Sequence, residues 1–305
     1  MAESVLITGG AGFIGSNLVI HLVNEGYDVI VVDKLTYAGN RGNLEPVDDQ
    51  ITFHEGDISD RELISTLYED VNLVVNLAAE SHVDRSIESG DPFVESNVHG
   101  AFVLMDELRS ADIDSFVQMS TDEVYGSIAD GQFDESDALD PSSPYSASKA
   151  SADLFATAFR KTYDLPVTVA RCTNLYGPRQ HPEKLIPKMI QRARAGDSLP
   201  VYGDGTNKRE WLYVEDACNA LQAILEDSNP EVYNIGGGTE KQNIEVVSTI
   251  VEQVGASEQL IEFVDDRPGH DFRYALNYEK LRSELGWDSS VSFEEGLRQT
   301  IDWYT

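Results

Sequence analysis

The side chains best suited to acid-base chemistry are two acidic neighbours, Asp122 and Glu123, and a tyrosine with a lysine four residues later, Tyr145 and Lys149. A lysine ammonium beside a phenol favours the phenolate and lowers the phenol's pKa, so Tyr145 could act as a base near neutral pH. Asp122 and Glu123 come just past the end of an apolar run that we expect to be a strand. Open α/β sheets place their ligand crevice at that end of a strand.

A helix is expected to hold the tyrosine and the lysine. Pro144 suits the first helical position and Ser143 the N-cap, which would put Tyr145 and Lys149 on one face. Tyrosine and lysine also occur at this spacing on ordinary amphipathic surfaces. The pair indicates a catalytic site only in combination with the acidic residues that accompany it.

The composition excludes several classes of protein. At 305 residues the chain is long enough for one or two domains, and 41% hydrophobic residues leave no case for disorder. The 54 acidic residues against 22 basic ones give a formal charge of -32, which argues against nucleic acid or an anionic membrane as a partner. Because the acidic residues are dispersed, we interpret them as a hydrated surface of the kind that halophiles use.

The two cysteines, Cys172 and Cys218, have no metal-ligand spacing, so we expect neither a metal site nor a disulfide framework. The N-terminus lacks a basic leader, and the sequence contains no apolar run of roughly 18 residues, the length that a spanning helix needs. We therefore expect a soluble, cytoplasmic protein.

A glycine-rich turn near the N-terminus predicts a dinucleotide site. Residues 5–7 read as a buried strand, and the pattern G-x-G-x-x-G over residues 10–15 opens an expected helix at 16–25. Such a turn brings backbone N–H groups close to a pyrophosphate at a helix N-terminus. A second strand ends in Asp33, whose carboxylate is placed to take the ribose hydroxyls and favours NAD over NADP. Lys34 beside it leaves the NADP alternative open.

Strands and helices alternate through the first half of the chain, which predicts an α/β fold of the Rossmann type with a doubly wound parallel sheet. Asp57 and Ile58 could lie beside the adenine of the dinucleotide, or they could simply form the start of a helix. Further strands are expected at residues 51–54, 73–77, 116–119 and 167–170, with helices at 61–68 and 97–109.

After residue 173 the regular alternation of strands and helices ends. Prolines there interrupt short helical pieces and predict a smaller, less regular region. One more strand is expected at 232–235 and two closing helices between residues 278 and 304.

Several motifs along the chain carry a family resemblance. They are the glycine turn at 9–15, DKLTYAGN at 33–40, AAESHVDRS at 78–86, TDEVYG at 121–126, YSASK at 145–149, PEKLIP at 182–187, WLYVED at 211–216 and DRPGHD at 266–271. On these residues the chain resembles, over nearly its whole length, the extended short-chain dehydrogenase/reductase family. Within that family it looks like the dTDP-glucose 4,6-dehydratases.

The resemblance implies an NAD-dependent hydro-lyase that converts dTDP-glucose to its 4-keto-6-deoxy product, in nucleotide-deoxysugar biosynthesis of the rhamnose type. It implies that Tyr145 takes the 4-hydroxyl proton, Glu123 the C5 proton, and that Asp122 protonates the departing 6-hydroxyl. Asp122 must then be protonated when it acts, so the two carboxyls need different pKa values. It further implies an NAD-binding Rossmann domain over 1–173, with a returning segment near 212–240, and a sugar-nucleotide domain over 174–305.

Site residues are carried over from the matching positions. The catalytic ones are Tyr145, Lys149, Asp122, Glu123 and Thr121. The cofactor-binding ones are Gly9, Gly12, Phe13, Ile14, Gly15, Asp33, Lys34, Leu35, Thr36, Asp57, Ile58, Leu77, Ala78, Ala79, Ser81, Tyr145 and Lys149. The substrate-binding ones are Ser81, Thr121, Asn174, Lys184, Leu185, Pro200, Tyr202, Arg209, Asn234, Arg267 and His270. Of these, Arg209 and Arg267 are expected to hold the diphosphate.

Two departures from the family pattern stand out: Leu175 replaces a usual asparagine, and the segment 126–142 is a short acidic loop. Three alternatives stay open. A UDP-sugar 4,6-dehydratase or a UDP-sugar 4-epimerase would use the same NAD machinery, but the epimerase would not need the Asp122 and Glu123 pair. A non-catalytic nucleotide-sugar-binding module is the third. The resemblance also implies a homodimer.

Overall fold

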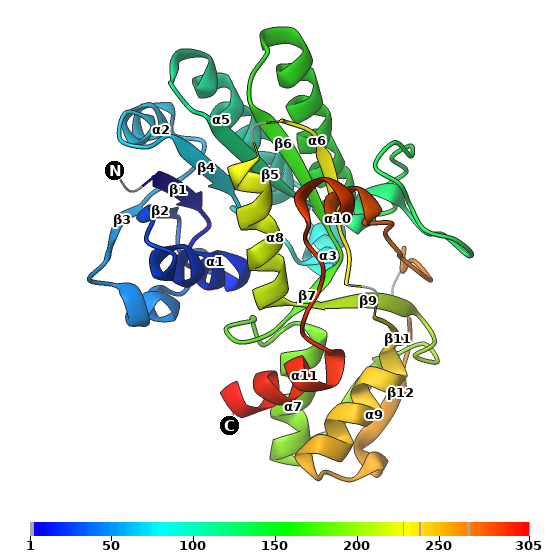
Figure 1. Ribbon diagram of the computed structural model, residues 1–305. Helices are drawn as coiled ribbons and strands as arrows, with labels where there is room; N and C mark the ends of the chain where they lie inside the picture. The colour runs from blue at the N-terminus through cyan, green and yellow to red at the C-terminus, as the bar shows by residue number, and fades with distance from the viewer. Residues whose placement is uncertain (1–2, 228, 238, 267–268, 305) are drawn as a thin grey trace.

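The computed structural model describes residues 3–227, 229–237, 239–266 and 269–304. Seven parallel strands form the central sheet in the order β10-β6-β5-β4-β1-β2-β3 (Figure 1). The strands are β1 Ser4–Thr8, β2 Asp28–Asp33, β3 Ile51–Glu55, β4 Leu73–Asn76, β5 Ser115–Thr121, β6 Val167–Cys172 and β10 Val232–Ile235. The strand order reverses between β1 and β4, which confirms the predicted doubly wound parallel sheet.

Helices cover both faces of the sheet because its central strands, such as β1 and β4, bury apolar side chains on both sides. On one face lie α1 (Phe13–Asn24) and α8 (Val214–Glu226), whose leucines Leu18 and Leu221 are fully buried. On the other lie α2 (Arg61–Tyr68), α5 (Ala101–Glu107) and α6 (Pro144–Tyr163).

The helix expected over 97–109 is split. A π-helix, η2 (Val94–Gly100), precedes α5, and a short 3-10 turn, η3 (Leu108–Ser110), follows it. Asn97, inside the π-helix, bonds to the backbone of Glu80 through both ends of its amide and donates to Ser148 Oγ at 2.8 Å. The expected helical stretch is therefore present, but its first turn is wider than an α-helix, and the bonds of Asn97 to other elements accompany that wider turn.

The start of α6 is as predicted. Ser143 Oγ accepts the Ser146 N–H at 3.1 Å, and Ser146 Oγ accepts the Ser143 N–H at 3.0 Å, which makes a capping box before Pro144. The cap fixes the first turn of α6, and Tyr145 therefore has a defined place at the edge of the sheet.

The remaining chain forms a second packed region below the sheet in Figure 1. Its elements are β7 Asn174–Tyr176, α7 Leu185–Ala195, β8 Leu199–Tyr202, β9 Lys208–Tyr213, β11 Glu240–Gln242, α9 Asn243–Val254, β12 Ile261–Val264 and α11 Phe293–Trp303. The helix α10 (Glu279–Leu285) lies apart from these, against β10. The first half of the chain thus holds six strands of the sheet and a later segment supplies the seventh, while the proposed boundary at residues 173 and 174 stays a prediction.

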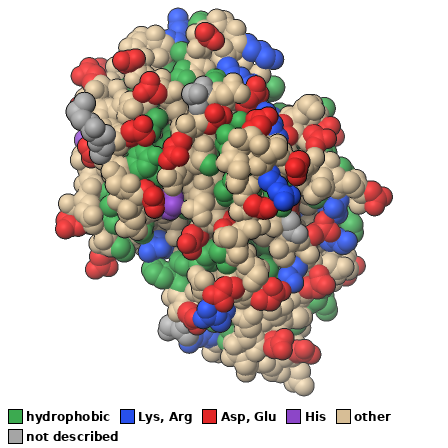
Figure 2. Space-filling model, in the orientation of Figure 1, with side chains coloured by type: hydrophobic (Ala, Val, Ile, Leu, Met, Phe, Trp, Pro, Cys, Tyr) green, Lys and Arg blue, Asp and Glu red, His purple; other side chains and the backbone are tan. Residues whose placement is uncertain are grey.

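Acidic side chains are scattered singly over the face shown in Figure 2, with few blue ones between them. Among the described residues, none of the helices has the length and apolarity needed to span a bilayer.

Candidate active site

A cavity of about 300 Å³ opens at the carboxyl ends of β1 and β4, where the strand order reverses. Its floor is the glycine turn. A Cβ on Gly15 would lie 2.1 Å from the Gly9 carbonyl oxygen, and a Cβ on Gly9, whose φ is +66°, would lie 2.7 Å from the Ala78 nitrogen. Only glycine lets the backbone close up in this way, so the residues present fit a bound pyrophosphate.

Asp33 is held rigidly at the end of β2. Its Oδ2 accepts the Ala11 N–H at 2.9 Å and its Oδ1 accepts the Leu35 N–H at 2.8 Å. Lys34 turns away from Asp33 and pairs with Asp57, with its Nζ 2.6 Å from Asp57 Oδ2. The lysine charge is thereby shared with a carboxylate, which weakens the case that Lys34 serves a 2'-phosphate.

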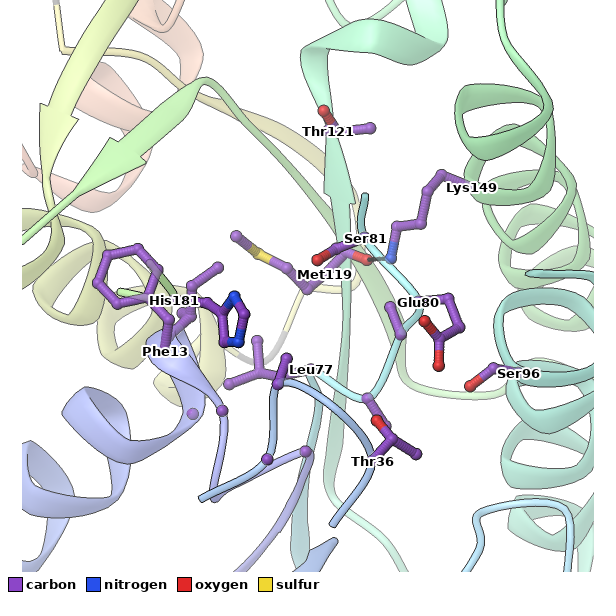
Figure 3. Close-up of a pocket in the computed structure, with 18 of the residues that line it drawn as sticks. Phe13, Thr36, Leu77, Glu80, Ser81, Ser96, Met119, Thr121, Lys149 and His181 are labelled. Atoms are coloured by element: carbon purple, nitrogen blue, oxygen red, sulfur yellow. Dashed lines mark hydrogen bonds between the residues drawn. The ribbon is translucent and has the colours of Figure 1, made fainter. Parts of the chain in front are cut away.

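Tyr145 and Lys149 both line the cavity from α6, but the expected lowering of the tyrosine pKa is wrong for this structure. Burial raises the pKa of the Tyr145 phenol, and Glu123 and Asp122 raise it further. The Lys149 ammonium instead donates to the Met119 carbonyl oxygen at 2.6 Å (Figure 3), and burial lowers its pKa to about 8. The spacing showed that the two side chains share a face, but not that two carboxyls surround the phenol.

Asp122 is the most unusual group in the site. Burial, followed by the negative charge of Glu123, raises its pKa to about 8, against the lowering effect of Arg209. Its Oδ1 lies 3.1 Å from Thr121 Oγ1, which also accepts the Glu123 N–H at 3.3 Å. Asp122 is therefore mostly protonated at pH 7, the state that an acid needs before it acts.

The cavity gathers most of the residues expected to bind cofactor. Its lining includes all of them except Leu35, whose backbone holds Asp33 from outside. The substrate positions Ser81, Thr121, Asn174 and Lys184 also line it. Asn174 Nδ2 is buried with no hydrogen-bond partner among the described residues, so it is available to a ligand.

The other expected substrate residues lie outside this lining. Leu185 begins α7, Pro200 and Tyr202 lie on β8, Arg209 on β9 and Asn234 on β10. His270 lies beside Tyr202, with 6.2 Å between ring centroids, and Arg267 falls outside the described residues.

Two of these residues are engaged with the protein itself. Arg209 donates to the carbonyl oxygens of Lys208 and Asp271 at 2.7 and 2.9 Å, although it remains close enough to lower the pKa of Asp122. Asn234 is fully buried, accepts from the Tyr125 hydroxyl at 2.8 Å and donates to two backbone carbonyls. The Asn234 amide is therefore already bonded within the protein, and its expected role at the substrate stays a prediction.

Sequence reasoning missed several lining residues. Ser96 comes from the π-helix, and no local signal marked it. Thr173 directly precedes Asn174 past the end of β6, a position that could have drawn attention to it. The other missed polar residues are Glu80, Ser120, Gln180, His181 and Glu183.

The fold and this cavity define the class: a doubly wound α/β protein with a dinucleotide-type cleft that also holds a tyrosine, a lysine and a pair of carboxyls. The family model described as GDP-mannose 4,6-dehydratase matches residues 6–300. The chain belongs to this family.

The chain is also similar to individual known proteins. The chain is 56% identical to the low-salt glycan biosynthesis protein Agl12 of Haloferax volcanii, over 98% of both chains. It is 46% identical to the dTDP-glucose 4,6-dehydratase DesIV of Streptomyces venezuelae, solved with NAD bound, with a TM-score of 0.97 over 99% of this chain and 97% of the other. A UDP-glucose 4-epimerase of Thermotoga maritima reaches a TM-score of 0.94 at 31% identity, over 99% and 98% of the two chains. The predicted resemblance to the dTDP-glucose 4,6-dehydratases is confirmed.

Proposed function

We propose that this protein is an NAD-dependent sugar-nucleotide 4,6-dehydratase that converts dTDP-glucose to dTDP-4-keto-6-deoxyglucose. The observation that carries the proposal is a pair of neighbouring carboxyls, of which Asp122 is buried with a raised pKa. Asp122 is 1% exposed with a pKa raised to about 8, beside Glu123 at the edge of the same cavity. Dehydration needs one group that gives a proton and one that takes a proton.

The residues that would hold NAD are the glycine turn, Asp33 at the ribose, and the backbone after β4. When bound, the cofactor would supply the hydride acceptor for oxidation at C4 and the hydride donor for reduction at C6. Because the returned hydride restores the oxidised form, we expect purified protein to turn over without added NAD.

The chain's own groups move the protons. Tyr145 takes the 4-hydroxyl proton once its phenol is ionised; the raised pKa opposes that ionisation but makes the phenolate, once formed, a strong base. Glu123 takes the C5 proton, which the 4-keto group has made acidic, and a proton returns to C5 when the hydride reaches C6. Asp122 gives its proton to the 6-hydroxyl oxygen as the C6–O bond breaks, which releases water and leaves Asp122 ionised.

Two alternatives differ from this proposal in chemistry. An epimerase shares the fold at 31% identity but has no elimination step for an Asp122 and Glu123 pair to perform. A UDP-sugar dehydratase differs only in the base, since thymine and uracil are distinguished by one methyl worth about 1 kcal/mol. The 46% identity to DesIV supports the thymidine nucleotide.

The deciding experiment is mass spectrometry of the products formed from dTDP-glucose, UDP-glucose and GDP-mannose. We expect loss of one water from dTDP-glucose at the highest kcat/KM, with no net NADH released. A product of unchanged mass would contradict dehydration, and preference for another nucleotide would correct the substrate.

We also propose a cytoplasmic homodimer formed through α6 and the helices beside it. Leu154 is 63% exposed and Phe155 36% exposed on α6, and Phe102 stacks edge-on against Phe155 with 5.5 Å between ring centroids. These side chains form an apolar surface that a second copy would cover. Light scattering in high salt should give a dimeric mass.

A further inference from the structure

Behind Asp122 lies Thr173, the residue between β6 and β7, whose hydroxyl has two oxygen neighbours. Thr173 Oγ1 is 2.9 Å from the backbone carbonyl oxygen of Glu210 and 3.2 Å from Asp122 Oδ2. Both side chains are buried, with 5% of Thr173 and 1% of Asp122 exposed. A hydroxyl carries a single hydrogen, so it can donate to only one of these oxygens.

The two distances indicate the direction of each bond. Both neighbours can accept the single hydrogen of Thr173, and the Glu210 carbonyl oxygen is the closer one, so we assign the hydrogen to that contact. A lone pair of Thr173 Oγ1 then faces Asp122 Oδ2, and two oxygens at 3.2 Å attract each other only with a hydrogen between them. On this assignment the hydrogen comes from Asp122.

The other carboxyl oxygen fits the same assignment. Thr121 Oγ1 accepts the Glu123 N–H and has its own hydrogen left for Asp122 Oδ1 at 3.1 Å. Oδ1 is thus an acceptor and Oδ2 carries the proton.

We propose that Thr173 is a positioning residue, which accepts a hydrogen bond from Oδ2 of protonated Asp122 and so holds this carboxyl in the acid form that water elimination requires. The inference rests on the proposed function for its role in the reaction. The bond directions rest on the contacts alone.

Charged and titratable groups around Asp122 come from several elements. Glu123 follows it in the chain, Glu210 and Arg209 come from β9, Tyr145 from α6 and Cys172 from β6. Glu123 and Glu210 oppose ionisation of Asp122, and Arg209 favours it. These charges shift the balance between acid and carboxylate, but only a hydrogen-bond acceptor selects the oxygen that is protonated.

Thr173 also affects the state of the site after Asp122 has given up its proton. Once Asp122 is ionised, Thr173 must either turn its hydrogen away from the Glu210 carbonyl or face the carboxylate with a lone pair. Both arrangements cost hydrogen-bond energy in a buried site, so the pair favours recovery of the proton before the next turnover.

The test is Thr173→Val, which keeps the side-chain volume and the exclusion of water but removes the acceptor. Infrared difference spectroscopy of the holoenzyme follows the protonated carboxyl as pH rises, and Asp122→Asn identifies its band. We expect Thr173→Val to lower the midpoint by about one pH unit, roughly the effect of one buried hydrogen bond. Thr173→Ser should restore the midpoint.

A matched control separates this effect from simple loss of a buried hydroxyl. Thr300 in α11 is fully buried and donates to the Gly296 carbonyl at 2.7 Å. Thr300→Val should therefore leave the Asp122 midpoint in place. If Thr173→Val fails to fold, Thr173→Ala removes the same acceptor with less crowding and serves instead.

If the titration midpoint of Asp122 in Thr173→Val is unchanged or higher, the proposal is wrong. A higher midpoint would mean that Thr173 donates to the carboxylate. The basic limb of the kcat profile should move with the midpoint, lowering kcat about fivefold at pH 8 and little at pH 6. If the band shifts as expected but no dTDP-glucose is dehydrated, the proposed function fails while the Thr173 assignment stands.

Discussion

The cofactor side of the site presents open surfaces, whereas much of the substrate side is occupied by its own protein contacts. Around the glycine turn, the missing Cβ atoms at Gly9 and Gly15 let backbone pack directly against backbone. On the substrate side, Arg209 bonds to backbone carbonyls and His270 Nδ1 lies 2.6 Å from Asp266 Oδ1.

The difference shows two ways to build a binding site. A turn closed by backbone packing is preformed, because no side chain has to give up a protein partner before a ligand binds. An arginine that already donates to carbonyls must exchange those partners for phosphate oxygens, and the exchange offsets part of the binding energy. We therefore expect the cofactor to stay bound through purification and the sugar nucleotide to come and go.

The largest expected effect on the reaction comes from the catalytic side chains between the cofactor side and the substrate side. Glu123→Gln removes the acceptor for the C5 proton but keeps the size of the side chain, so dehydration should slow by about a thousandfold. Oxidation at C4 should continue, and enzyme-bound NADH should accumulate in its absorbance band. Tyr145→Phe should abolish that band as well, because the 4-hydroxyl proton then has no acceptor.

An exposed residue supplies the control for this pair. Glu69→Gln, at the end of α2, should leave the rate and the absorbance unchanged. Dehydration by Glu123→Gln at an undiminished rate would refute the role of Glu123 and remove the main argument against an epimerase.

A second substitution tests the cofactor side of the site alone. A Cβ on Gly15 would lie 2.1 Å from the Gly9 carbonyl, so Gly15→Ala should displace the turn and weaken NAD retention by about a hundredfold. Released cofactor is measured by absorbance after gel filtration. Gly90→Ala, where no atom lies within 4 Å of the added Cβ, is the matched control.

A third substitution tests the substrate side of the site. Arg209→Lys keeps the charge but loses the guanidinium fork, so KM for the sugar nucleotide should rise about tenfold. NAD retention should not change, and loss of NAD from this variant would erase the distinction between the two sides.

The pH dependence tests the acid itself. Since Asp122 acts in its protonated form and its pKa is raised to about 8, kcat should fall as pH rises through that value, by about tenfold for each further unit. A profile flat to pH 10 would count against Asp122 as the acid, and Asp122→Asn should lose this limb together with most of its activity.

The smallest expected effect concerns both sides equally. The formal charge of -32 is spread over the surface, and at low ionic strength, where the Debye length reaches roughly 30 Å, it should destabilise the fold. The melting temperature should rise between dilute buffer and molar KCl. Equal melting temperatures in the two solutions would exclude this contribution.

The parts of the molecule that obey local rules were predictable from sequence. The glycine turn, the end of β2 at Asp33 and the Ser143 cap each depend on residues a few positions apart. The π-helix and the size of the pKa shift of Asp122 were not predictable, because both depend on packing between elements: the contact with Ser148 for the first, and the complete burial of the carboxyl for the second. Family resemblance placed Asn234 at the substrate, but only coordinates reveal that its amide is already bonded within the protein.

The position of β10 at the edge of the sheet has a consequence for synthesis of the chain. β6 is complete at Cys172, yet its outer edge pairs only with Val232–Ile235, some sixty residues later. A nascent chain that has already folded its first six strands therefore exposes an unpaired, apolar strand edge, the kind that joins neighbouring chains. Until the ribosome has delivered Ile235, the growing protein depends on its acidic charge or on a chaperone to keep that edge from pairing with another copy.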